Sequence, residues 1–127
     1  MPFWKSNSGG GGGGGSEVAQ VEAIIKAGVA AVANNVLPPG LRIPQAFTAT
    51  QTHVRLGTAP TGAGLSVRFK KNGVAFSTVT VPAGVVSAAV TGLSVAFVAG
   101  DVLTWDVTAI GSSTAGADVA AAVVGTA

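Results

Sequence analysis

The chain has 127 residues, of which 48% are hydrophobic and only 9% are charged, with a net charge of +2 and no cysteine. A soluble domain normally carries about 25% charged residues, so we expect other molecules to cover part of this surface. The lack of cysteine excludes disulfide and thiolate chemistry within the chain. The basic residues are scattered, whereas nucleic-acid-binding proteins gather them in a stripe.

Residues 1–16 are predicted to form an extended arm, in which Phe3 and Trp4 precede a glycine run. The run comprises Gly9, Gly10, Gly11, Gly12, Gly13, Gly14 and Gly15. Fixing one backbone residue costs about 1–2 kcal/mol, so holding seven would cost on the order of 7–14 kcal/mol. In one interpretation neighbouring subunits hold the glycines and the aromatic pair is an anchor. In the other the run is a flexible tether.

Residues 17–37 are predicted to form an α-helix that begins after Ser16, a suitable N-cap, and ends before Pro38. Alternating spacings of three and four indicate a packing seam of the heptad type. The seam comprises Val18, Val21, Ile25, Gly28 and Val32. The helix would pack on the chain's own β domain or on other copies, in which case we favour a trimer. Polar residues interrupt the segment, so we expect no membrane span.

Residues 38–127 are predicted to form an antiparallel β-sandwich or jelly-roll-like domain, because short strand patterns recur between turn signals. The fold class is therefore mainly β, preceded by one helix and the glycine-rich arm. Expected strands are 52–56, 65–70, 74–81, 85–90, 93–98, 102–107 and 119–124. Asn72-Gly73 predicts a hairpin. Phe69 and Trp105 are expected to be the largest core side chains.

The strand patterns also assign faces. Leu65, Val67 and Phe69 are expected to face inward, with Arg68 and Lys70 outward. Leu103, Trp105 and Val107 are expected to share one face. Arg55, Arg68 and Lys70 are candidates for one outward basic face, which either keeps the domain soluble or contacts an acidic subunit or an anionic glycan.

The sequence contains no catalytic constellation. His53 is the single histidine; it is expected to face outward beside Arg55, without the partner that acid–base catalysis needs. Asp101 and Asp118 suit turns, although together at one end of a sandwich they would offer Ca²⁺ ligands. The glycine run lacks the lysine and hydroxyl of a phosphate loop. We therefore predict no enzyme activity, no cofactor and no metal site.

Four stretches of the β segment carry a resemblance to a known family: LGTAPTG at 56–62, KNG at 71–73, AGDVLT at 99–104 and IGSSTAGADV at 110–119. They resemble modules of tailed-bacteriophage virion proteins. The resemblance covers about two-thirds of the chain, consists mainly of turn signals and excludes the arm and the helix segment. It implies a β-sandwich used for structure or docking, in a virion assembled in the host cytoplasm, and no catalytic residues.

The leading hypothesis is a non-enzymatic structural protein of a phage virion. It would be a minor tail, tail-tip or fibre component, attached by its arm and helix to other virion proteins or to sister copies. One alternative is a capsid decoration protein on the head surface. Another is a carbohydrate-binding module for host recognition. With two tryptophans and no tyrosine, the chain offers few aromatic platforms for sugars.

Overall fold

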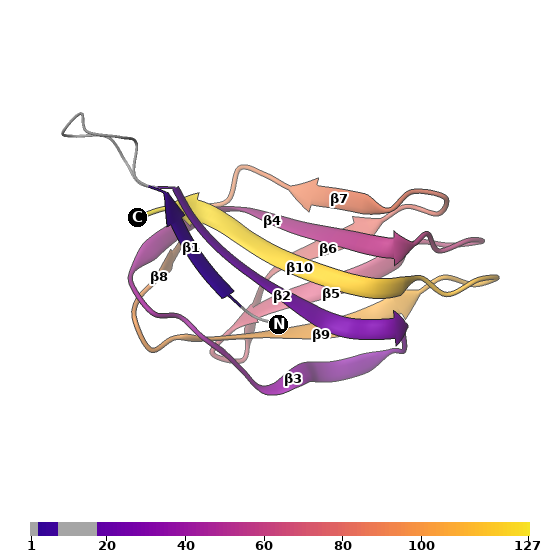
Figure 1. Cartoon of the computed structure of the whole chain (residues 1–127), viewed down its shortest axis with the longest axis horizontal. Coiled ribbons are helices and arrows are strands. Elements are labelled where there is room, and N and C mark those ends of the chain that lie inside the picture. The colour runs from indigo at the N-terminus through magenta and orange to yellow at the C-terminus, as the bar shows by residue number, and fades with distance from the viewer. Residues whose placement is uncertain (1–2, 8–17) are drawn as a thin grey trace.

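The computed structural model describes residues 18–127 with their side chains and residues 3–7 by their backbone alone. The strands of these residues form two antiparallel sheets that pack face to face (Figure 1). The predicted antiparallel β-sandwich is therefore confirmed. The glycine run at 9–15 lies outside the described residues, as do the side chains of Phe3 and Trp4.

The larger sheet, called sheet A here, has the strand order β1–β2–β10–β4–β7, and β8 pairs with β4. Its strands are β1 (Phe3–Asn7), β2 (Val18–Val29), β4 (Phe47–Thr58), β7 (Ser87–Val90), β8 (Val95–Phe97) and β10 (Ala117–Thr126). The C-terminal strand β10 lies at its centre and pairs along its length with β2 on one side and β4 on the other. Sheet A therefore contains both the first strand and the last strand, β1 and β10.

The smaller sheet, called sheet B here, has the order β3–β9–β5–β6. Its strands are β3 (Ala33–Arg42), β5 (Leu65–Lys71), β6 (Val74–Val81) and β9 (Val102–Ile110). The predicted hairpin joins β5 to β6, with positive φ angles of 50° at Asn72 and 84° at Gly73. Both turn positions take the left-handed conformation that a tight hairpin of this kind requires.

The helix predicted at 17–37 is wrong, because the described residues of that segment form β2 and the first part of β3. Residues Ala19, Val21, Ala23 and Ile25 alternate with more exposed neighbours and are buried in the core. The proposed seam does not form one face. Val21 and Ile25 are buried, whereas Val18 is 48% and Val32 63% exposed.

The end of β2 also shows why no helix forms here. Gly28, placed in the seam, has a φ of 79°, a left-handed value that does not occur within a right-handed helix. Its N–H donates to Asp118 Oδ1 at 2.7 Å. The N–H of Ala30 donates to the Gly116 carbonyl oxygen at 2.9 Å. The turn after β2 is thus bonded to the start of β10.

Two prolines lie within β3, where the sequence predicted only the end of a helix. A cis peptide bond joins Pro38 to Pro39. Proline cannot donate to a strand ladder and is therefore confined to edges and irregular positions. β3 is an edge strand of sheet B, and its pairing with β9 is interrupted between Val36 and Leu41. The edge position is what makes the two prolines compatible with a strand.

The small inward side chains of β10 in sheet A leave room in the core for larger ones on sheet B. Phe69 and Trp105 are fully buried, as predicted, and their rings meet edge to face at 6.4 Å. Leu65, Val67, Leu103 and Val107 are buried with them, so the predicted inward faces of 65–70 and 102–107 are confirmed. The inward residues of β10 are Val119, Ala121 and Val123. Because these are small, the bulky residues of sheet B can fill the space between the layers.

The N-terminal arm contributes β1, which pairs antiparallel with β2 from Phe3 opposite Glu22 to Asn7 opposite Val18. This strand was not predicted. The connection between β1 and β2 is residues 8–17. A hairpin between adjacent antiparallel strands normally needs only two to five connecting residues. The connection is therefore about twice as long as the pairing of β1 with its own β2 requires.

A substitution at Gly125 tests how closely β10 packs against β4. A Cβ atom at this position would collide with the Thr48 carbonyl oxygen, beside the register shift between Val124 and Gly125. We predict that Gly125→Ala lowers the free energy of unfolding by about 1–3 kcal/mol, measured by urea denaturation. Gly73→Asn is the control, because its Cβ would meet open space and asparagine tolerates positive φ. Equal stability of Gly125→Ala and the wild type would contradict this packing.

Candidate functional site

The outer face of sheet A is built from three rows of residues that cross β2, β10 and β4. The registers place Gln20–Val124–Gln51 in one row, Glu22–Ala122–His53 in the next and Ile24–Ala120–Arg55 in the third. Each row has a small apolar residue in the middle and longer side chains on both sides. The buried residues on either side of them in sequence face the core, so strand alternation turns these rows outward.

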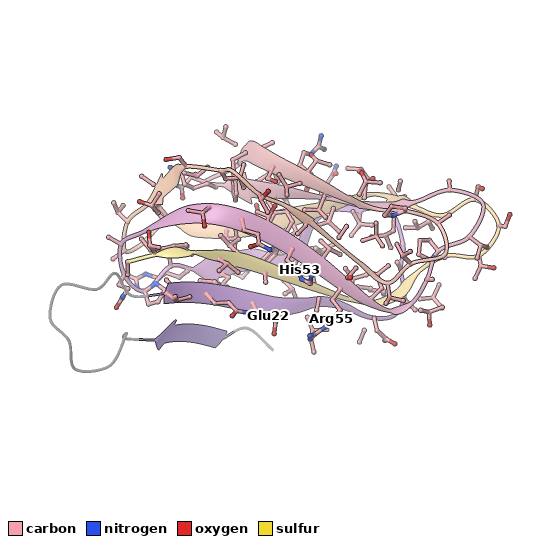
Figure 2. The ribbon with its side chains drawn as sticks, turned by 90° about the horizontal axis from the view of Figure 1, so that it is seen from above. Glu22, His53 and Arg55 are labelled. Carbon is pink, nitrogen blue, oxygen red and sulfur yellow. The ribbon has the colours of Figure 1, made fainter. Side chains whose placement is uncertain are left out.

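Three ionisable side chains on the described part of this face have no internal partners. Figure 2 shows Glu22, His53 and Arg55 close together on the side of the molecule formed by sheet A. Within the described residues, no hydrogen bond or ion pair engages the side chains of these three residues. Glu22 and His53 lie on either side of Ala122, about 10 Å apart at the backbone because two strand spacings separate them. The outward position predicted for His53 is confirmed.

A hollow of about 370 Å³ lies at one end of this face, beside Arg55 and Ala120. Ile24, Ala27, Gly57 and Asp118 also line it. Ile24 is 51% exposed, so an apolar side chain stands beside the charged ones. The outer face of sheet A thus combines small residues on its central strand, ionisable groups without partners and exposed apolar surface, which are features of contact surfaces.

The outer face of sheet B is different, because its charges neutralise one another. Asp106 is 3% exposed and accepts from three groups. Its Oδ2 lies 3.1 Å from Arg68 Nη2, and its Oδ1 lies 2.9 Å from Lys70 Nζ and 2.9 Å from the backbone N of Asn35. Arg68 is the cross-strand neighbour of Asp106. This network ties β3 and β5 to β9.

The network lowers the pKa of Asp106. Burial by itself raises the pKa of this carboxyl, but the hydrogen bonds from the Asn35 N–H, Lys70 and Arg68 outweigh it and hold the pKa below its usual value. The carboxylate is consequently charged at neutral pH, and both of its oxygens already have partners within the fold.

The prediction that Arg55, Arg68 and Lys70 share one basic face is wrong. Arg68 and Lys70 lie on sheet B and pair with Asp106, whereas Arg55 lies on β4 of sheet A. The sequence showed that all three were outward, but it could not show that β4 and β5 belong to different sheets.

Asp101 acts in a turn, as predicted. Its carboxylate accepts from the N–H of Val98 and from the side-chain amide of Asn72, both at 2.9 Å, and these two bonds lower its pKa. Asp118, the other candidate Ca²⁺ ligand, instead accepts from Gly28. In the described part of the chain, no three acidic, histidine or cysteine residues gather as a metal site would require.

A second hollow, of about 490 Å³, lies beside the cis bond between Pro38 and Pro39 on sheet B. It is lined by Asn35, Pro38, Pro39, Asn72, Gly73, Val102 and Thr104. The side-chain oxygens of Asn35 and Asn72 already accept bonds, from Lys70 and from the Val102 N–H. This hollow therefore presents fewer free groups to a ligand than the face of sheet A does.

Aromatic side chains do not provide a sugar platform in the residues that the structure describes. Phe47, Phe69, Phe97 and Trp105 are buried, and Phe76 packs against the core. No helix within 18–127 is long and apolar enough to cross a membrane.

Comparison with known proteins identifies no family for this chain. No protein-family model matches it, and no curated protein sequence does. Among solved structures, it is similar to a GH26-CBM35 β-(1,4)-mannanase from Podospora anserina, with 14% identity and a TM-score of 0.39. The match covers 100% of this chain and 26% of that protein, so this chain spans about a quarter of its length. A likeness this distant says nothing about what this chain binds.

The Asp106 network gives a prediction with a defined pH dependence. Because its folded pKa is lowered, Asp106 contributes stability above its unfolded pKa of about 3.9, and this contribution is lost as pH falls through the folded value. We predict that Asp106→Asn is less stable at pH 7 by about 1–3 kcal/mol and that the difference narrows below about pH 4. Urea unfolding at pH 7 and pH 3 measures both.

Asp118→Asn is the matched control, because Asp118 is exposed and an amide oxygen can still accept from Gly28. Its effect on stability should be much smaller. An Asp106→Asn variant as stable as the wild type at pH 7 would show that the network is not needed to join β3 to sheet B.

Proposed function

We propose that this chain is a non-enzymatic structural protein of a phage virion, a minor tail, tail-tip or fibre component that joins other virion proteins or sister copies through its N-terminal arm. The observation that carries the proposal is the arm strand β1, which adds to the edge of sheet A by pairing with β2. Strand addition to a sheet edge is a common way for one protein to bind another.

The connection between β1 and β2 supports this role. Residues 8–17 contain seven glycines, and ten extended residues span roughly 33 Å. A strand that only had to fold back on β2 would be better joined by a short turn, because each extra flexible residue adds closure entropy. The length and composition suit a strand that reaches the β2 edge of a neighbouring copy, or a sheet edge on another virion protein.

The turn-signal resemblance to virion modules and the low charge content also favour assembly over catalysis. The helix is no longer part of the mechanism, since its residues form strands. A trimer was expected only from packing of that helix, so nothing now favours three copies. A homo-oligomer remains part of the proposal. Carbohydrate binding is less well supported, because no described aromatic residue forms an exposed platform.

Shortening the connection tests the anchoring role. Deleting residues 10–15 leaves four residues between β1 and β2, enough for a hairpin within one chain but too few to reach another. We predict that this variant folds normally, by circular dichroism and thermal unfolding, but fails to enter the particle, by immunoblot of purified virions. A variant with alternate glycines of the run changed to serine keeps the length and should be incorporated normally.

The site of β1 docking is tested by cysteine pairing, since the chain has no cysteine. Lys5 lies opposite Gln20 in the register. In particles that contain Lys5→Cys and Gln20→Cys on separate copies, mild oxidation should link the two copies. Ser6→Cys with Gln20→Cys is the out-of-register control. Normal incorporation of the shortened variant, or no link between copies, would contradict docking on a sister copy.

A further inference from the structure

We propose that the outer face of sheet A binds the same face of a second copy, in a two-fold dimer whose axis lies within about 15° of the direction of β10. This interaction is separate from the proposed virion role and does not require it. Self-association through identical patches needs a surface whose two halves are complementary to each other. The three rows across β2, β10 and β4 have this property.

The symmetry follows from the position of β10. A two-fold axis that lies along β10, between the two copies, places β2 of one copy over β4 of the other and β10 over β10. Because Glu22 and His53 are both level with Ala122, Glu22 of each copy then faces His53 of the other. An axis across the strands would instead oppose the two Glu22 side chains, and like charges in this position repel.

The neighbouring rows agree with this arrangement. The row of Val124 places Gln20 opposite the other copy's Gln51, so two side-chain amides can exchange hydrogen bonds. The row of Ala120 places exposed Ile24 opposite Arg55, whose aliphatic stem can cover it. The Arg55 guanidinium then lies one row from the other copy's Glu22, about 7 Å along the strand, within reach of a long side chain. Every acid or amide on β2 thus meets a base or amide on β4.

The shape of the face permits a close approach. Ala122 is 3% exposed and Ala120 and Val124 are no larger than valine, so nothing tall stands on the central strand. Stacked sheets lie about 10 Å apart and cross at about 30°, which a low central ridge flanked by longer side chains can accommodate. Five strands and the length of β10 give on the order of 600 Å² per copy, near the lower bound for a specific interface.

Among residues 18–127, the remaining ionisable groups of this face are Lys26 and Asp118, at its far end. Strands that cross at about 30° diverge with distance from the crossing point, so the centre of the contact is the Glu22–Ala122–His53 row. Substitutions in this row therefore test the interface most directly, and each one acts twice, once in each half of the dimer.

Sedimentation equilibrium of the full chain, with single and paired charge reversals, tests the proposal. The wild type is expected to show a concentration-dependent dimer. Glu22→Lys and His53→Glu should each weaken dimerisation about tenfold or more. Glu22→Lys removes the carboxylate that accepts from His53 and brings a lysine close to Arg55, and His53→Glu places two carboxylates opposite one another; each change acts twice in the dimer. The double variant Glu22→Lys/His53→Glu exchanges the charges and should return to within a few-fold of the wild-type constant.

Thr78→Glu is the matched control, because it adds the same charge at an exposed position of β6 on sheet B and should leave the dimer unchanged. Thermal unfolding of each variant shows whether the fold is retained. A wild type that stays monomeric at high concentration, a dimer insensitive to both single reversals, or a double variant as weak as the singles would each overturn the proposal. Particle incorporation of the single reversals reports separately on the virion role.

Discussion

The central strand β10 is the constraint on which the rest of the structure depends. It is the last strand of the chain, yet it lies between β2 and β4 and pairs with both. Its residues 119–125 include no side chain larger than valine. Sheet A can therefore approach the bulky residues of sheet B on one side and presents a low surface on the other. A larger residue here would separate the layers or raise a ridge on the outer face.

The two outer faces follow from how charge is placed around this scaffold. On sheet B the buried carboxylate of Asp106 forms ion pairs with Arg68 and Lys70. It also accepts a hydrogen bond from the backbone of the irregular edge strand β3. On sheet A, Glu22 and His53 stand on opposite sides of β10, and no ion pair joins them within one copy. Groups that are not paired within a chain are available to another one. The same separation makes this face complementary to itself.

Much of the sandwich could be predicted from local sequence, and the exceptions have physical causes. The hairpin at Asn72-Gly73 and the faces of 65–70 and 102–107 depend on alternation and turn chemistry, which act over a few residues. The segment 18–29 was misread because Val21 and Ile25 fit both a heptad and an alternating pattern, and its alanines favour helix in isolation. These residues form a strand because they pair with β10, about 100 residues away in the sequence. Helix propensity depends only on local sequence and takes no account of such pairing.

The candidate site was only partly visible in the sequence. His53 and Arg55 were placed correctly as outward neighbours, but Glu22 was assigned to the helix, so its level position with His53 across Ala122 could not be foreseen. The strand β1 was missed because FWKSN has no alternating pattern, and its pairing depends on the free edge that β2 offers. Alternation in 19–25, with Ala19, Val21, Ala23 and Ile25 on one face, was the signal that could have revealed β2.

Amide hydrogen exchange of the full chain, followed by NMR, tests the central position of β10 most directly. Amides that bond within the middle of a sheet exchange only through large-scale opening. The account predicts that residues 119–125 contain the slowest amides of the chain and that residues 19–25 are protected together with them. Rapid exchange at 19–25 while β10 stays protected, or helical contacts between residues three and four apart in that segment, would contradict it.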